Sequence, residues 1–188
     1  MHSIQKVSAY LIWIFNILLI AIPFWIITIW VLIEWTPFKT LLAQGFISKP
    51  IETPEGIVNL ANLKFTTLSW SIGLASALIG FIPIFLGIFV LKHLFLNYQK
   101  GNIFSLKNAQ QYKYLGWLFF LDGMLVKPLC NMLQILSATL SNPPGHRYLS
   151  LNFGTPNLEV LFCGLLIIVI SWVMAEGYKL QEDQSLTI

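Results

Sequence analysis

The sequence predicts an all-α integral membrane protein, built as a bundle of four transmembrane helices. Four apolar stretches carry this prediction, at residues 10–33, 68–91, 115–136 and 158–175. Each has about the 20 helical residues that are needed to cross a hydrocarbon core of ~30 Å. The composition agrees, because only 10% of the residues are charged, against about 25% in soluble domains.

The 188 residues suffice for a single membrane domain and leave no room for a separate soluble domain of useful size. Outer loops are expected at residues 34–67 and 137–157, an inner loop at 92–114 and an inner tail at 176–188. Lys and Arg in the connecting segments and termini number six on the inner side and four on the outer side. The positive-inside rule therefore predicts that both termini are cytoplasmic.

The end of the first stretch and the loop after it belong to the outer interface. Trp30 and Trp35 suit the aromatic belt that marks a membrane–water boundary. Residues 34–67 are too polar to span a bilayer. They allow a small β-hairpin on the membrane surface, with strands at residues 57–60 and 63–66.

Small residues crowd the early turns of the second stretch, where they allow helix backbones to approach closely. Gly73 with Ala77, and Ser76 with Gly80, each form a pair of small residues four positions apart. We expect this half of the helix to pack against other helices of the same chain. Dimerisation through the same residues is the alternative, so the oligomeric state stays open.

The inner loop is basic and contains no acidic residue. A helix is predicted to begin there at about Leu106, because Ser105 can cap its free backbone N–H groups. Phe104 can pack back across the first turn of this helix. The helix then runs directly into the third apolar stretch.

The third stretch holds the unusual charges, Asp122 and Lys127, with Asn131 one turn further on. A Lys at mid-membrane costs roughly 2.5–3.5 kcal/mol on insertion scales, so it should face the bundle interior or reach a partner. The two charges lie about 140° apart on an ideal helix, although Pro128 disturbs the helix there. One interpretation is a polar intramembrane site for an ion, proton or ligand. The other, which we favour, is a structural lock in which Lys127 pairs with Asp122 or snorkels.

No motif for catalysis or for binding a metal or cofactor is present, and we expect no enzyme. The nucleophile elbow, P-loop, zinc-protease signature and dinucleotide fingerprint are absent. Cys130 and Cys163 fall within apolar stretches, where cysteine usually serves as a small packing residue. The net charge of +3 is spread over several loops, which predicts no direct contact with nucleic acid.

Two segments resemble a bacterial membrane family, domain of unknown function 2975. Residues 97–109, NYQKGNIFSLKNA, are similar to the family's basic stretch, where Gly is followed by Phe-Ser/Thr and then Asn-Ala. Residues 176–188, EGYKLQEDQSLTI, are similar to its ending, with an acidic pair and a closing Leu-Thr-Ile/Val. The resemblance implies a small four-helix protein of the bacterial cytoplasmic (inner) membrane. Members are often encoded beside a short helix-turn-helix regulator, which implies a membrane-and-repressor pair, and the family brings no catalytic residues.

Both segments are expected on the cytoplasmic face, where they could dock such a regulator. The candidate docking residues are Lys100, Gly101, Phe104, Lys107, Asn108, Lys113, Glu182 and Asp183. Basic inner loops also bind anionic headgroups, so membrane lipids are the competing partner. The expected function is that of a regulatory or sensory protein. The alternative is a small transporter or channel subunit with a polar site around Asp122, Lys127 and Asn131.

Overall fold

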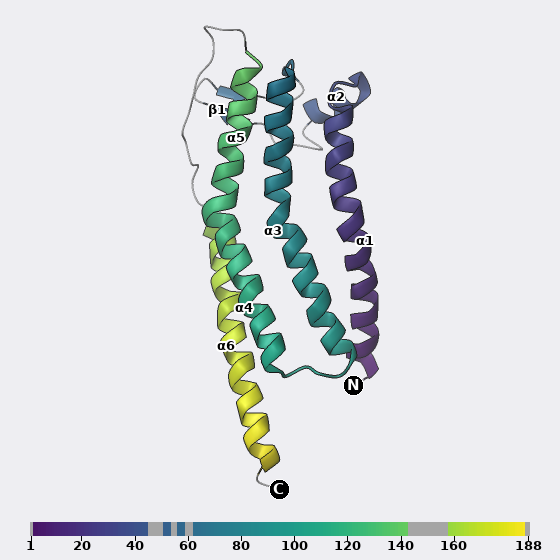
Figure 1. Cartoon of the computed structure of the whole chain (residues 1–188), viewed down its shortest axis with the longest axis vertical. Helices are drawn as coiled ribbons and strands as arrows, with labels where there is room; N and C mark the ends of the chain where they lie inside the picture. Colours follow the sequence, from purple (N-terminus) through teal and green to yellow (C-terminus); the bar gives the residue numbers. More distant parts are fainter. Residues whose placement is uncertain (1, 45–50, 54–55, 59–61, 143–157, 187–188) are drawn as a thin grey trace. The chain divides into compact units, whose positions relative to one another are not determined.

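The computed structural model of the chain describes residues 2–44, 51–53, 56–58, 62–142 and 158–186. Among these residues, four helices are long and apolar enough to cross a membrane (Figure 1). They are α1 (His2–Leu32), α3 (Thr67–Gln99), the continuous helix Leu106–Leu140 and α6 (Leu158–Leu186). The prediction of four helices of membrane-spanning length and hydropathy is therefore confirmed for the described residues.

The long helices extend well beyond their apolar stretches. α1, α3 and α6 have 31, 33 and 29 residues. At ~1.5 Å per residue they measure roughly 44–50 Å, which exceeds the ~30 Å thickness of a hydrocarbon core. α3 continues to Gln99 and α6 continues to Leu186, so both helices include residues for which the sequence predicted a loop or a tail.

The third long helix consists of three parts. A π-helix, η2 (Asp122–Val126), separates α4 (Leu106–Leu121) from α5 (Lys127–Leu140). Pro128 stands at the second position of α5, where it provides no N–H and its ring crowds the carbonyl group one turn earlier. A single wide turn accommodates this misfit without breaking the helix.

A short helix, α2 (Thr36–Ala43), occupies part of the expected first outer loop. Pro37 stands in its first turn, where a missing N–H costs no helical hydrogen bond. Phe38 is buried and packs with Trp30 and Ile33. The buried Phe38 ring anchors α2 to this core.

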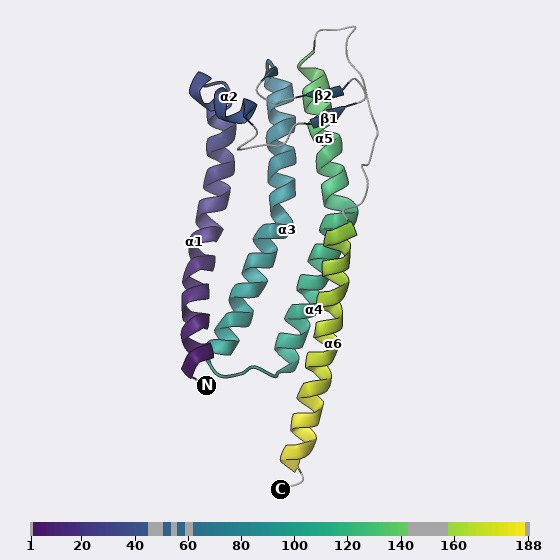
Figure 2. The same ribbon diagram turned by 180° about the vertical axis from the view of Figure 1, so that it is seen from behind.

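The β-hairpin predicted at residues 57–60 and 63–66 is not supported. Residues 63–66 form no strand, and residues 59–61 lie outside the described part of the chain. The described residues of this loop instead contain two three-residue strands, β1 (Ile51–Thr53) and β2 (Gly56–Val58). These pair antiparallel, and β1 lies beside α5 (Figure 2).

The described residues form two compact units, to which α1 and α3 both contribute. The first unit comprises the described residues of Met1–Ala21, Ile82–Met124 and Asn157–Ile188. The second comprises those of Ile22–Phe81 and Leu125–Pro156.

In the first unit, α4 runs along α6 at very short range (Figures 1 and 2). Gly116 and Gly164 face each other at the crossing. A Cβ atom on Gly116 would lie 2.8 Å from the carbonyl oxygen of Gly164, and one on Gly164 would lie 2.9 Å from that of Gly116. No larger residue fits without a shift, so the two backbones are in direct contact.

In the second unit, the core forms around Trp30. Its backbone oxygen accepts a 2.9 Å hydrogen bond from Nε1 of Trp70, and the two rings meet edge to face. The ring of Trp30 also covers Gly73, where a Cβ atom would collide with it. Trp30 thus belongs to the buried core, whereas Trp35, its predicted companion in the aromatic belt, is exposed.

Small residues join α3 to α5 in the second unit. The Ser137 hydroxyl donates a 2.6 Å hydrogen bond to the backbone oxygen of Ser69. The Ser76 hydroxyl donates to the backbone oxygen of Cys130 at 2.9 Å, and the Cys130 thiol donates back to that of Ser76 at 3.4 Å. The small-residue face of α3 therefore packs within the chain, as the sequence predicts.

Candidate functional site

Residues 100–105 connect α3 to α4 and are called the α3–α4 turn. A glycine, Gly101, terminates α3 at the start of this turn. The N–H of Asn102 donates to the carbonyl group of Asn97 and that of Gly101 to Tyr98, both at 3.0 Å. Gly101 adopts φ 83°, a left-handed conformation that favours glycine. This pattern is the Schellman motif, and it fixes the direction in which the chain leaves α3.

The start of α4 is capped as the sequence predicts. Ser105 has extended backbone angles, φ −153° and ψ 149°, and its hydroxyl oxygen accepts a 3.2 Å hydrogen bond from the N–H of Asn108. α4 then begins at Leu106. The two helix ends on either side of the turn are thus both determined locally.

Asn108 holds the α3–α4 turn together from inside. Its Nδ2 donates to the backbone oxygens of Asn102 and Ile103, at 2.7 and 2.8 Å. Its Oδ1 accepts a 2.7 Å hydrogen bond from Nδ2 of Asn97 on α3. The residue is fully buried, so it shapes the turn and presents no side chain to a partner.

A pair of tyrosines makes a second link between the same helices. The hydroxyl groups of Tyr98 on α3 and Tyr112 on α4 lie 2.7 Å apart in a hydrogen bond. The sequence interpretation missed this pair and also the role of Asn97. The sequence offered one signal for both links: Asn97 and Tyr98 stand shortly before the α3–α4 turn, and Asn108 and Tyr112 stand shortly after it.

The two segments that resemble the family meet in space. Phe104 at the α3–α4 turn lies against Gly177 of α6, where a Cβ atom would be 3.5 Å from Cδ1 of the ring. The Phe104 side chain is nevertheless 52% exposed. An aromatic ring is therefore presented at the surface next to a turn of fixed shape.

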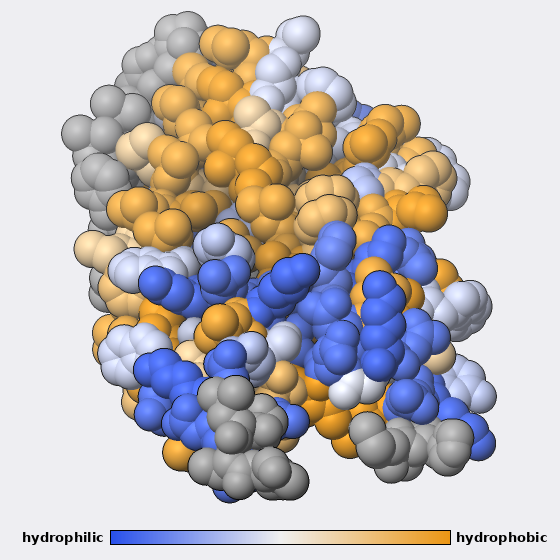
Figure 3. Space-filling view, turned by 60° about the horizontal axis from the view of Figure 1, so that its bottom comes forward, coloured by the Kyte–Doolittle hydropathy of each residue, from blue (hydrophilic) through white to orange (hydrophobic). Residues whose placement is uncertain are grey.

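Five of the predicted docking residues are charged and exposed. Lys100, Lys107 and Lys113 are exposed, and so are Glu182 and Asp183 on the last turns of α6. Figure 3 looks toward this end of the first unit, and hydrophilic residues gather there while hydrophobic residues cover the flank above them. Of the predicted docking residues, all but the buried Asn108 and the partly buried Gly101 are exposed.

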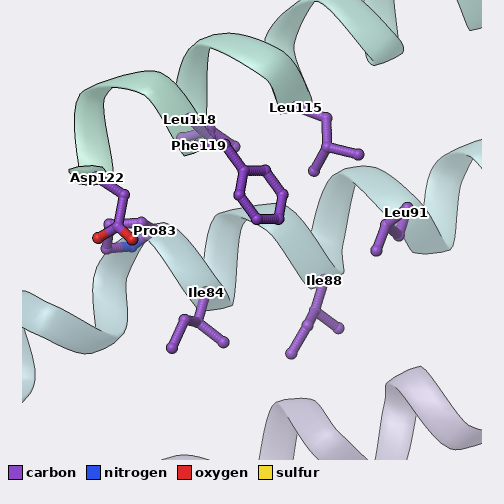
Figure 4. Close-up of a pocket in the computed structure, with 9 residues that line it drawn as sticks. Pro83, Ile84, Ile88, Leu91, Leu115, Leu118, Phe119 and Asp122 are labelled. Carbon is purple, nitrogen blue, oxygen red and sulfur yellow. The ribbon is translucent and has the colours of Figure 1, made fainter. Parts of the chain in front are cut away.

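Asp122 lies at the end of an apolar cavity in the first unit. The cavity has a volume of about 170 Å³ and is formed between α3 and α4. Hydrophobic side chains line it, among them Ile84, Ile88 and Phe119. Figure 4 shows the carboxylate of Asp122 at one end of the cavity, beside Pro83.

The predicted intramembrane trio is divided between the units. Asp122 is half-buried and belongs to the first unit. Lys127 and Asn131 lie on α5 in the second unit, where Lys127 is exposed and Asn131 is half-buried. The sequence identified the charged residue of the cavity but not the residues that enclose it.

The described part of the chain contains no candidate metal site and no disulfide bond. No group of three or more His, Cys, Asp or Glu residues there could hold a metal ion. Cys130 and Cys163 form no disulfide with each other.

Comparison with known families covers almost the whole sequence. The family described as Protein of unknown function (DUF2975) matches residues 3–188. The chain belongs to this family. The resemblance drawn from residues 97–109 and 176–188 is therefore confirmed, and DUF2975 membership extends to the helices between them. No curated protein and no solved structure matches the chain.

Proposed function

We propose that this DUF2975 protein is a regulatory or sensory protein of the bacterial cytoplasmic (inner) membrane that docks a small cytoplasmic partner, such as a helix-turn-helix regulator. Both termini would then be cytoplasmic. The docking surface would consist of the α3–α4 turn, the first turns of α4 and the end of α6. Its exposed members are Lys100, Phe104, Lys107, Lys113, Glu182 and Asp183.

The exposed ring of Phe104 is the main observation in favour of docking. Aromatic side chains bury large areas and contribute much of the binding energy in protein interfaces. Phe104 stands on a turn that the buried amide of Asn108 ties to α3. A surface that is already ordered loses little conformational entropy when a partner binds, which favours affinity.

The three lysines give the docking surface a charge that a partner could complement. Lys100, Lys107 and Lys113 are all exposed on or near the α3–α4 turn. Complementary charges steer association and disfavour wrong partners. A small regulator with an acidic patch would fit this surface, with Phe104 as the apolar contact.

Anionic lipid headgroups are the competing ligand for the same lysines. Headgroups would use the positive charge and would require no particular shape from the turn. Placing the purified chain in bilayer discs of phosphatidylcholine alone removes this competitor. A docked protein should stay bound there, and lipid binding through the lysines should be lost.

Co-purification of the tagged chain from its native membrane tests the docking proposal. Wild type should recover a small DNA-binding protein, and Lys107→Glu combined with Lys113→Glu should lower its recovery about tenfold, which corresponds to ~1.4 kcal/mol. Lys64→Glu is the matched control, because Lys64 is also exposed but belongs to the second unit. Recovery of no regulator, together with unchanged transcription after deletion of the gene, would count against docking.

Transport is the second candidate, because Asp122 lines the cavity and belongs to a helix that could span the membrane. Intramembrane charges often mark ion or substrate paths. Lys127→Leu separates the interpretations when proton and small-cation flux is measured in proteoliposomes. A transport site predicts that flux is lost while the protein still folds, whereas a structural lock predicts that only stability changes.

A further inference from the structure

Three of the four long helices are shared between the two units, and each contains a proline near the point where it passes from one unit to the other. The division falls after residue 21 in α1, after residue 81 in α3 and after residue 124 in the third long helix. Pro23, Pro83 and Pro128 each stand within four residues of that division. In contrast, α6 belongs to the first unit alone and contains no proline.

A proline weakens a helix at a defined hydrogen bond, because it has no N–H. In α1 the bond from residue 23 to the carbonyl group of Leu19 cannot form, and in α3 the bond from residue 83 to that of Ile79 cannot form. Each of these bonds would span the division of its helix. α1 and α3 therefore resist bending least where the units divide.

The third long helix has a further irregularity at its division. The π-helix η2 encloses residue 124, and Pro128 follows in the first turn of α5. Prolines and π-helical turns are usual causes of sharp bends in helices. All three shared helices are thus weakened at the point where they pass between the units.

Prolines are common in membrane helices, so their number alone carries little weight. Their positions are more informative. The one further proline among the described residues is Pro37, which stands in the first turn of α2, where no helical hydrogen bond is lost. Every described proline inside a long helix thus coincides with the division, and the long helix that lies within one unit has none.

Each unit has close internal contacts that hold it together as a body. In the first unit, the backbones of α4 and α6 are in contact at Gly116 and Gly164. In the second unit, the Ser137 hydroxyl on α5 donates to the backbone oxygen of Ser69 on α3. A hinge consists of a few residues that absorb a change in backbone angles between two such bodies.

We propose that Pro23, Pro83 and the segment from η2 to Pro128 form one hinge, at which the second unit reorients as a body with respect to the first. Collective motions of this kind occur between microseconds and milliseconds. The docking surface lies wholly in the first unit, so the hinge would couple it to events at the second unit. This consequence for docking rests on the proposed function, whereas the hinge itself does not.

Double electron–electron resonance between two spin labels tests the hinge in the full chain, in phosphatidylcholine discs and without any partner. Cys130→Ala and Cys163→Ala remove the native thiols. Labels at Gln134→Cys on α5 and Gln181→Cys on α6 form the inter-unit pair, and labels at Gln110→Cys on α4 and Gln181→Cys form the first-unit pair; all three glutamines are exposed. The distance distribution of the inter-unit pair should be clearly broader than that of the first-unit pair.

Replacing the hinge prolines should remove this extra width. Pro23→Ala, Pro83→Ala and Pro128→Ala together should narrow the inter-unit distribution and leave the first-unit distribution unchanged, because the missing N–H groups are restored. Pro37→Ala, the matched control, should change neither distribution. An inter-unit distribution as narrow as the first-unit one would overturn the hinge even if the triple variant does not fold. Retention of the full width by a folded triple variant would overturn it as well, and neither result depends on whether a regulator docks.

Discussion

The side-chain amide of Asn97 donates a 2.7 Å hydrogen bond to Oδ1 of Asn108 and so connects the end of α3 with the first turn of α4. Asn108 passes this constraint on to the α3–α4 turn, since its own amide binds two backbone oxygens there. The exposed ring of Phe104 stands on this turn. The shape of the proposed docking surface therefore depends on one buried amide.

Replacing Asn108 by Ala should destabilise the protein by about 2–3 kcal/mol, because buried donors and acceptors lose their partners. Thermal unfolding in detergent measures the loss. Asn102→Ala is the matched control, because Asn102 contributes its backbone oxygen while its side chain is exposed. Equal unfolding temperatures for the two variants would show that the Asn108 amide does not hold the turn.

A second prediction concerns the contact between α4 and α6. Gly116→Ala should lower the free energy of unfolding by about 1–2 kcal/mol, since the cost of overpacking exceeds the ~1 kcal/mol gain in helix propensity. Gly87→Ala places its methyl group at an ordinary distance from Leu115 and should be neutral or stabilising. If Gly116→Ala proves as stable as Gly87→Ala, the close approach to Gly164 is wrong.

The hydrogen bond between Ser137 and Ser69 should contribute little despite its burial. Hydrogen bonds between membrane helices average about 0.6 kcal/mol, with a maximum near 1.7 kcal/mol. Ser137→Ala should cost an amount in this range in a denaturant titration. Ser71→Ala, whose hydroxyl bonds within its own helix to Thr67, should cost less. The reverse order would contradict the packing of α3 on α5.

Topology gives a prediction that does not depend on side chains. If all four candidate helices cross the membrane, the two ends of the chain lie on the same side of it. Reporters fused to each terminus should both be active in the cytoplasm and inactive outside it. Activity of the two reporters in opposite compartments would mean that one of the four helices does not span.

Local signals in the sequence were sufficient for the spans and for the start of α4. Hydropathy identifies the apolar stretches because a hydrocarbon core requires about 20 consecutive apolar residues in each helix that crosses it. Ser105 predicts the start of α4 because a cap acts on N–H groups within three residues. Helix lengths were underestimated, because backbone hydrogen bonding continues where hydropathy falls.

Features that depend on how side chains pack in the folded chain could not be predicted. α2 forms where Phe38 packs on Trp30 and Ile33, and no pattern within residues 34–67 indicates that contact. The cavity beside Asp122 depends on how α3 and α4 face each other, which a single sequence does not contain. The exposed position of Lys127 likewise follows from the rotation of α5 and not from hydropathy.

A photo-crosslinking amino acid at position 104 tests the docking proposal most directly, because benzoylphenylalanine keeps an aromatic ring where Phe104 is exposed. Irradiation of intact cells should link it to one small soluble protein, and Lys107→Glu with Lys113→Glu should reduce that product. The same probe at Phe24, which is 71% exposed on the apolar helix α1, is the control and should link only to lipid or membrane proteins. If position 104 gives the same products as position 24, the docking surface does not exist.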